Sequence, residues 1–122
     1  MQPQTRWLSL DGTLQLGRPE QPDALLHDLL RLYRRGLCEP LEFFPKSAWS
    51  YVKNGGSLSA AYKAWAPTRA RPFAEGADAT YRLGFRGRGD PLAGEFAVLA
   101  QRVFGPVCQQ VCTPQDSEGP RP

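Results

Sequence analysis

The chain has few of the residue types that most often carry catalysis or bind metal ions. Its 122 residues include one histidine, His27, and three cysteines, Cys38, Cys108 and Cys112. An odd number of cysteines argues against a disulfide framework and favours a reducing cytoplasm. Cys108 and Cys112 lie one helical turn apart, so they would serve either as two zinc ligands or, as we favour, as small buried side chains.

Long hydrophobic runs are also missing. The apolar runs are only a few residues long, and we therefore expect no membrane-spanning helix. The polar segment Met1–Arg6 does not resemble a signal peptide. With 41% hydrophobic residues the chain is suited to one folded domain, and its 12 prolines and 12 glycines predict short elements with many connections.

Acidic residues are absent between Glu42 and Glu75, in a chain with a net charge of +3. Basic and aromatic side chains alternate through this acid-free stretch, an arrangement that suits a surface tracking a phosphate backbone and stacking on bases. The alternative is that the aromatic residues form the core and the cations are their solvated neighbours. The stretch contains Lys46, Lys53, Lys63, Arg69 and Arg71 together with Phe43, Phe44, Trp49, Tyr51, Tyr62, Trp65 and Phe73.

The first predicted element is a β-hairpin. Apolar and polar residues alternate in residues 6–10 and 13–16, on either side of Asp11-Gly12. We expect Asp11 and Gly12 to form the two-residue turn, because an Asp-Gly pair readily adopts the positive φ angles that such turns need. Since a two-stranded ribbon alone is marginal in water, it should either pack on the helices or extend a sheet whose other strands lie outside this chain.

A helical pattern follows the hairpin. Leucines recur at helical spacing after Pro22, which fits the first turn, and Gly36 is expected to end the helix. Arg31, Arg34 and Arg35 crowd the predicted last turn, where the helix dipole favours cations. These arginines serve either as dipole-compensating residues on a wet face or as contacts for a partner or DNA.

Shorter helices should come next. Residues 41–45 are expected to be extended before Pro45, and Ser47 should cap a helix that runs through Val52. The Asn54-Gly55-Gly56 segment should stop that helix, and Ser57 should cap another over residues 58–66.

The last part of the chain is predicted to contain long loops and one helix. We expect loops at residues 67–80 and 84–90, because both segments are rich in proline, glycine, arginine and aspartate. A helix should run from near Pro91 to Cys112, with an interruption at Gly105-Pro106. Residues 1–112 then form one domain, and residues 113–122 form a disordered tail.

Three stretches of the sequence, taken in order, carry a resemblance to a known family. They are residues 29–37 with Pro40-Leu41 and Phe43–Trp49; Ala64-Trp65 with Glu75–Ala79 and Tyr81-Arg82; and Phe85–Gly87 with Asp90–Leu92, Glu95-Phe96, Leu99-Ala100 and Val103–Pro106. No single motif among them is specific, whereas the ordered set is. Together they resemble the C-terminal domain of RecC, the gamma subunit of the RecBCD helicase–nuclease, also called exodeoxyribonuclease V.

The resemblance implies a fold. We expect an α+β, predominantly helical chain, with a short N-terminal β-hairpin followed by four or five helices. It should be a degenerate, truncated form of the restriction-endonuclease-like domain, also written PD-(D/E)XK. In active relatives a helix carrying Gln and Tyr follows the catalytic strands, and residues 29–37 are similar to that helix with Tyr33 kept and no Gln beside it.

Catalysis is not expected of this degenerate form. A metal-dependent nuclease needs clustered carboxylates and a lysine, usually as an acid on one strand and Glu-x-Lys on the next. No Glu-x-Lys or Asp-x-Lys occurs in the chain, and Asp11 is explained by its turn. We therefore predict no catalytic residue, no metal ligand, no cofactor and no small-molecule substrate, with a residual nuclease as the unfavoured alternative.

The resemblance also implies a function and partners. The module would help to hold RecD, contact RecB and the rest of RecC, and handle DNA as a single strand or a forked duplex end during double-strand break repair by homologous recombination. A pure docking platform without DNA contact is the alternative, which burial of both Trp49 and Trp65 would favour. The expected contact residues are Arg34, Arg35, Lys46, Trp49, Lys53, Trp65, Arg69, Arg71, Arg86 and Arg88.

The resemblance places the sequence at the end of a very long subunit. We therefore expect Met1 to begin a fragment. Surfaces that other parts of the assembly cover should then appear as exposed apolar patches.

Overall fold

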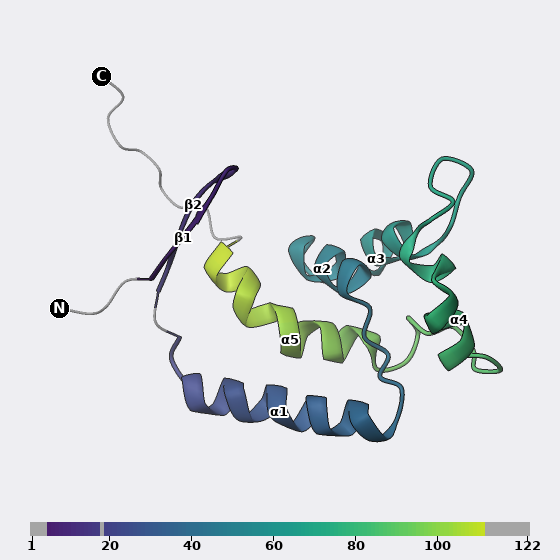
Figure 1. The fold of residues 1–122 in the computed structure, drawn as a ribbon, viewed down its shortest axis with the longest axis horizontal. Helices are drawn as coiled ribbons and strands as arrows, with labels where there is room; N and C mark the ends of the chain where they lie inside the picture. Colours follow the sequence, from purple (N-terminus) through teal and green to yellow (C-terminus); the bar gives the residue numbers. More distant parts are fainter. Residues whose placement is uncertain (1–4, 18, 112–122) are drawn as a thin grey trace.

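The computed structural model describes residues 5–17 and 19–111 (Figure 1). Within these residues a β-hairpin is followed by five α-helices and one 3-10 helix, which confirms the expected α+β class with a helical majority. No helix in this part of the chain has both the length and the hydropathy needed to cross a membrane. Cys112 and the predicted tail, 113–122, lie outside the described residues. The elements are β1 (Thr5–Ser9), β2 (Gly12–Leu16), α1 (Pro22–Cys38), α2 (Pro45–Lys53), α3 (Leu58–Trp65), η1 (Glu75–Ala77), α4 (Ala79–Gly84) and α5 (Phe96–Val111).

The hairpin turn lies one residue earlier than predicted. Ser9 pairs with Gly12, so the two-residue loop is Leu10-Asp11, and the prediction of an Asp11-Gly12 turn is wrong. Asp11 does not have a positive φ angle, whereas Gly12 has a φ of 146°, which favours glycine. The Ser9 hydroxyl donates a hydrogen bond to the Gly12 carbonyl at 3.1 Å and closes the turn.

The hairpin packs on a helix, which is one of the two arrangements expected for it. The Gly17 N–H donates a hydrogen bond to the Gln110 Oε1 of α5 at 2.9 Å. Leu14 and Leu16 of β2 are half-buried, while every residue of β1 is exposed. Within the described residues, the contact between the ribbon and α5 is therefore made chiefly through β2.

The first helix, α1, runs two residues past its predicted end. Gly36 was expected to terminate it, but the backbone stays helical to Cys38 and becomes extended at Glu39. A Cβ at Gly36 would lie 3.3 Å from the Leu41 Cδ1. The glycine thus permits a close approach of the following segment and does not end the helix.

The second helix, α2, begins two residues before its predicted cap. Ser47 lies buried in the first turn, and its Oγ has no hydrogen-bond partner within the described residues, so the capping prediction is wrong. The carboxylate of Glu75 caps α2 instead, accepting the backbone N–H groups of Lys46 and Ser47 at 2.8 Å each. A carboxylate at a helix start satisfies unpaired N–H groups and lies at the positive end of the dipole.

The next boundaries follow the sequence closely. Gly55 and Gly56 end α2 with φ angles of 69° and 85°. Ser57 caps α3 as predicted, because its Oγ accepts the Ala60 N–H at 3.2 Å. The helix ends at Trp65, one residue before the predicted boundary.

The core is an aromatic cluster centred on Phe44. Its ring is fully buried and lies 4.3 Å from the ring of Trp65, 4.9 Å from Tyr81 and 5.2 Å from Phe85, centroid to centroid. Phe96 of α5 lies 6.3 Å away in a stacked orientation. One side chain thereby joins the segment before α2 to α3, α4 and α5.

Part of the segment predicted as loop at residues 67–80 is helical. It contains η1 and the start of α4, which Asp78 caps by accepting the Thr80 N–H at 2.8 Å. A Cβ at Gly76 would lie 2.6 Å from the Trp65 carbonyl oxygen, so only glycine lets η1 pack this closely on α3. Such short helices form because of tertiary contacts and leave a weak pattern in the sequence.

The last helix, α5, differs from its prediction at both places that involve proline. It begins at Phe96 and not near Pro91, and it continues through Pro106 to Val111 without the expected interruption. Pro106 removes one backbone hydrogen bond. The ring of Phe104 nevertheless packs on Phe43 at 5.5 Å, and this contact supports the helix beside the proline.

Polar contacts attach α1 to α5 near the middle of both helices. Leu32 is the one buried side chain of α1. The guanidinium of Arg102 donates two hydrogen bonds to the Asp28 carboxylate, at 3.1 Å and 2.5 Å. One side of α1 is therefore held against α5.

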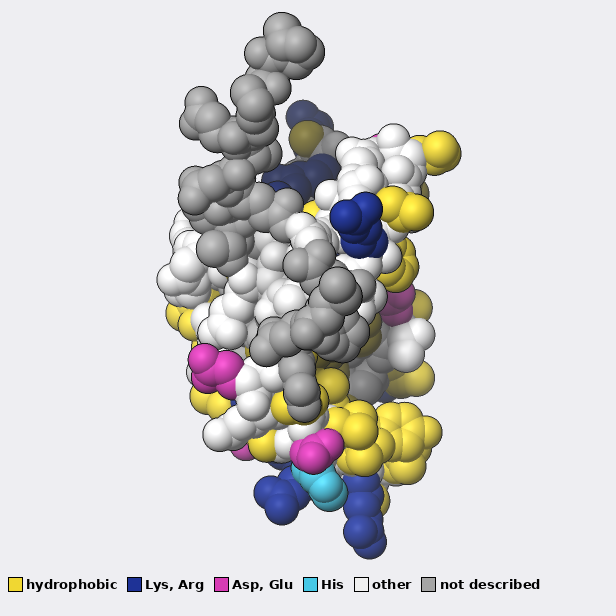
Figure 2. Space-filling view, turned by 90° about the vertical axis from the view of Figure 1, so that its left-hand side faces the viewer, with side chains coloured by type: hydrophobic (Ala, Val, Ile, Leu, Met, Phe, Trp, Pro, Cys, Tyr) yellow, Lys and Arg dark blue, Asp and Glu magenta, His cyan; other side chains and the backbone are white. Residues whose placement is uncertain are grey.

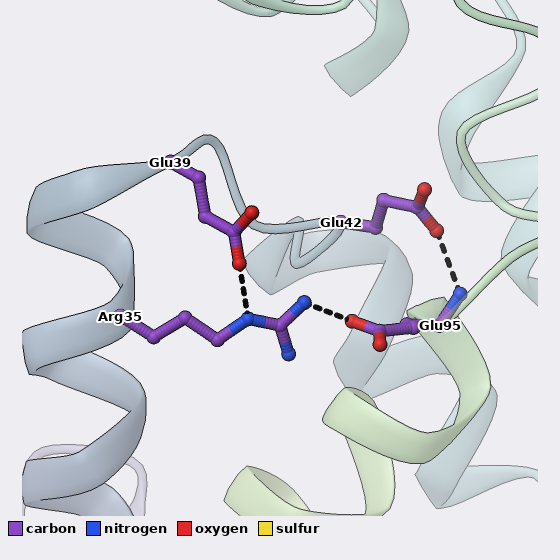
Figure 3. Close-up of polar contacts among 4 residues, drawn as sticks. All are labelled: Arg35, Glu39, Glu42 and Glu95. Carbon is purple, nitrogen blue, oxygen red and sulfur yellow. Dashed lines mark hydrogen bonds and ion pairs between the residues drawn. The ribbon is translucent and has the colours of Figure 1, made fainter.

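A second polar contact fixes the end of α1 (Figure 3). Arg35 forms ion pairs with Glu39 at 2.5 Å and with Glu95 at 2.6 Å. The backbone N–H of Glu95 donates to the Glu42 Oε2 at 2.7 Å. Arg35 thereby links the end of α1 to the segment that begins α5.

Replacing Glu75 with alanine should lower the free energy of unfolding by about 1–3 kcal/mol, because two N–H groups at the start of α2 lose their acceptor. Urea unfolding followed by circular dichroism measures this difference. Glu20→Ala is the control, since Glu20 is exposed and its removal should change the free energy of unfolding by less than about 0.5 kcal/mol. Equal effects of the two substitutions would contradict the capping role.

The ion pair between Asp28 and Arg102 should make stability depend on pH. The hydrogen bond from Arg102 lowers the pKa of the Asp28 carboxyl below its ordinary value of 3.8. The stabilisation is therefore present above pH 3.8 and disappears as the pH falls through the lowered pKa of the folded state. Both side chains are about one third exposed, so Asp28→Asn should cost only roughly 0.5 kcal/mol at neutral pH.

Acid titration of the unfolding free energy checks this expectation. The difference between Asp28→Asn and the unchanged chain should shrink below about pH 4, because Asp28 becomes protonated first in the unfolded state and then, below its lowered pKa, in the folded state. Glu20→Gln serves as the matched control. A difference that stays constant down to about pH 2 would rule out the linkage.

Candidate functional site

One side of α1 presents a row of large apolar side chains to solvent. Leu26, Leu30, Tyr33 and Leu37 follow a spacing of four, three and four residues, which places them on the same side of the helix. Their exposed fractions run from 55% to 71%. We call these four residues the α1 face. Figure 2 shows yellow hydrophobic side chains gathered beside dark-blue basic ones at the lower end of the molecule, where α1 lies.

Basic side chains flank the α1 face. Arg31 and Arg34 are exposed, and neither forms an ion pair within the part of the chain that the structure describes. The predicted contact residue Arg34 therefore lies at the edge of an apolar row. Arg35 was predicted beside it, but its guanidinium is engaged by Glu39 and Glu95.

The hairpin adds a second exposed apolar surface. Trp7 and Leu8 are adjacent in β1, so their side chains point to opposite faces of the ribbon, and both are exposed. Leu10 in the turn is fully exposed. An open groove of about 840 Å³ lies between α5, the end of β2 and the start of α1, with Leu16, Leu25 and Val107 among its walls.

The four basic residues of the acid-free stretch that were predicted as contacts lie on α2 and on the loop after α3, while Lys63 lies on α3 itself. Lys46 and Lys53 are seven residues apart on α2, so they share one side of the helix, and both are exposed. Arg69 and Arg71 are exposed on the loop of residues 67–73, which extends beyond α3 and α4 in Figure 1.

The two predicted tryptophans pack against other rings. Trp65 lies on Phe44 in the core, and Trp49 meets Phe104 at 5.6 Å in an edge-on arrangement. Both tryptophans are half-buried. Full burial of both would favour a docking platform without DNA contact, and this condition is fulfilled only in part. Their contact with a partner stays a prediction.

The last two predicted residues lie apart from the others along the chain. Arg86 and Arg88 follow α4 and are exposed. The guanidinium of Arg88 lies 5.7 Å from the centre of the Phe85 ring, a cation–π contact. The ten predicted contact residues are thus distributed over α1, α2, α3 and two loops.

A hollow of about 420 Å³ lies at the base of the 67–73 loop, and Lys46, Phe73 and Tyr81 are among its lining residues. Burial raises the pKa of the Tyr81 hydroxyl, and the charges of Glu75 and Asp78 add to this effect. The hydroxyl therefore stays protonated at neutral pH. Phe73 was noted in the sequence only as one aromatic residue among seven, because nothing in its local pattern shows that it is exposed.

Acidic, histidine and cysteine side chains do not gather into a cluster of three or more that could hold a metal ion, as far as the described residues go. Asp11 is exposed in the hairpin turn. Cys38 is exposed and Cys108 is half-buried. The zinc alternative also involves Cys112, which lies outside the described residues.

Comparison with known proteins gives one match. The family model of the RecC C-terminal domain matches residues 6–56, which span the hairpin, α1 and α2. No curated protein and no solved structure matches the chain. The first of the three resembling stretches falls in the matched range, and the other two fall after it. The predicted resemblance is therefore confirmed over residues 6–56, where this chain is similar to the RecC C-terminal domain.

Proposed function

We propose that this chain is a non-catalytic docking module of the RecC subunit in a RecBCD-type helicase–nuclease, acting in double-strand break repair by homologous recombination. The α1 face is the observation that carries the proposal. A helix on the surface of a soluble protein normally directs its apolar row toward the core. A row left uncovered and edged by polar residues is typical of a protein interface.

The composition of this surface fits a docking role. Tyrosine and arginine are enriched at protein interfaces, and Tyr33 and Arg34 lie next to each other on α1. The family match includes all of α1. RecD is the partner that we propose for the α1 face, with RecB and the rest of RecC as further neighbours of the module.

The absence of catalysis belongs to the same proposal. We infer a degenerate restriction-endonuclease-like fold, in which the hairpin stands for the remains of the catalytic sheet and α1 for the helix that follows it. Tyr33 is retained on that helix, but no Glu-x-Lys or Asp-x-Lys accompanies the hairpin. Such a chain lacks the carboxylate and lysine pair that places Mg²⁺ and activates water in nucleases of this fold.

Contact with DNA is the second half of the proposal. The acid-free stretch places exposed Lys46 and Lys53 along one side of α2, and Arg69 and Arg71 on the adjoining loop. Lysine and arginine side chains on neighbouring elements suit a phosphate backbone and give no base specificity. The packing of Trp49 and Trp65 on other rings favours the alternative, a docking platform without DNA contact.

Polar substitution of the α1 face should weaken docking and leave the fold intact. The double variant Leu30→Ser with Tyr33→Ser should reduce co-purification with RecD at least about tenfold. Each of the two side chains should contribute about 1 kcal/mol or more to the binding free energy, and together this corresponds to a reduction on that order. Its free energy of unfolding should change by less than about 0.5 kcal/mol per site, since both side chains are more than half exposed.

Leu83→Ser is the matched control for docking. Leu83 is 73% exposed on α4 and lies outside the α1 face. It should leave co-purification unchanged. Undiminished recovery of RecD by the double variant, or an equal reduction in the control, would contradict docking through the α1 face.

Removal of the basic residues tests the DNA half separately. Alanine at Lys46, Lys53, Arg69 and Arg71 together should weaken single-strand binding and flatten its dependence on salt, by roughly 0.7 in the log–log slope for each phosphate that these residues no longer neutralise. Fluorescence anisotropy across a salt series measures both quantities. A control with alanine at Arg6, Arg31 and Arg82, which lie outside the acid-free stretch, should keep the slope. Equal slopes in the two variants would remove the DNA half of the proposal.

A further inference from the structure

Phe73 is exposed to an unusual degree for a phenylalanine. Its exposed fraction is 92%, and its ring packs on no other ring of residues 5–17 and 19–111. Leaving such a side chain in water forfeits roughly 1.5–3 kcal/mol that burial would provide. Core packing therefore does not account for the aromatic residue at this position.

The loop that carries Phe73 is held in place by hydrogen bonds. Thr68 and Arg71 exchange two backbone hydrogen bonds, each of 3.1 Å, and the Thr68 Oγ1 also accepts the Arg71 N–H. The Ala74 N–H then donates to the Arg71 carbonyl at 3.3 Å. A ligand that stacks on Phe73 would meet an ordered platform, which reduces the entropic cost of binding.

Basic groups lie in the hollow beside Phe73 and in the loop that carries it. Lys46 of α2 shares with Phe73 the lining of the hollow of about 420 Å³. Arg69 and Arg71 are exposed on the loop itself and have no ion pair within the described part of the chain. A hollow of this volume falls within the range of small-ligand sites, roughly 300–1,000 Å³.

Two carboxylates also line the hollow. Glu75 is occupied, because both of its oxygens accept backbone N–H groups at the start of α2. The Asp78 carboxylate uses one oxygen to cap α4 and forms part of the wall of the hollow. The negative charge of these carboxylates repels a phosphate group from the wall of the hollow but does not repel an uncharged base. The hollow therefore favours the base of a nucleotide, and the basic residues around it favour the phosphates.

From this arrangement we propose that Phe73 and the adjoining hollow bind one nucleotide of a single strand, with its base stacked on the Phe73 ring and the neighbouring phosphates held by Lys46, Arg69 and Arg71. The inference rests on the DNA half of the proposed function. It assigns the stacking role to Phe73, and not to Trp49 or Trp65, whose rings are engaged within the fold.

The test separates the stacked base from the charged backbone. The full chain is titrated with a fluorescent oligothymidine and with an abasic oligomer of the same length and charge. Phe73→Ala should weaken binding of oligothymidine about tenfold, the usual effect of removing one stacked base, and should leave the salt slope unchanged. Binding of the abasic oligomer should not change. Phe73→Trp keeps an aromatic face and should restore the affinity.

The outcomes distinguish the inference from the proposed function. Leu83→Ala, which also shortens an exposed apolar side chain, should bind as the unchanged chain does. If Phe73→Ala binds oligothymidine as tightly as the unchanged chain, the inference fails while DNA binding stands. If Phe73→Ala instead lowers co-purification with RecD and leaves oligothymidine affinity intact, Phe73 is a protein contact and the inference is overturned. If the unchanged chain binds neither oligomer, both the inference and the DNA half of the proposed function fail.

Discussion

The burial of Phe44 is the constraint on which the helical body of this protein depends. Its side chain lies in an extended segment, between α1 and α2, and not within a helix. Rings from α3, α4 and α5, together with Phe85 just after α4, surround it at centroid distances of 4.3 to 6.3 Å. Aromatic contacts of this kind add about 0.5–1.5 kcal/mol each beyond the area that they bury. Helices as short as α3 and α4 are marginal alone, so their stability comes from this shared contact.

The attachment of α1 contrasts with that aromatic core. Leu32 is its one buried side chain, and the ion pairs of Asp28 and Arg35 supply much of the remaining contact. Ion pairs near the surface contribute little to the free energy of folding. They therefore fix the position of α1 and add little to its stability. The same geometry turns the α1 face outward. A weakly buried helix with an uncovered apolar row is suited to completing its packing on another protein.

Surface charge and exposed aromatic groups are distributed unevenly over the rest of the molecule. The tryptophans Trp49 and Trp65, which are the usual candidates for base stacking, contribute to packing through Phe104 and Phe44. Phe73 is exposed on a hydrogen-bonded loop among three basic residues. In our proposals the two roles therefore involve separate elements. Docking involves α1, whereas contact with the DNA strand involves the start of α2 and the 67–73 loop. Separate substitutions can test the two roles.

The sequence by itself determined the features that depend on neighbours along the chain. It indicated the hairpin, the start of α1 at Pro22, the stop at Gly55-Gly56 and the Ser57 cap, because each rests on local backbone preferences. It also indicated the resemblance to the RecC C-terminal domain, which the match over residues 6–56 bears out.

Tertiary structure decided the rest. The capping role expected of Ser47 belongs to Glu75, which lies 28 residues away, and Pro106 remained within α5 next to the packed ring of Phe104. The exposure of Leu30 and Phe73 could not be foreseen either, because the same side chains would suit a core. Local patterns specify how the backbone turns, whereas burial depends on which distant segments come to cover a side chain.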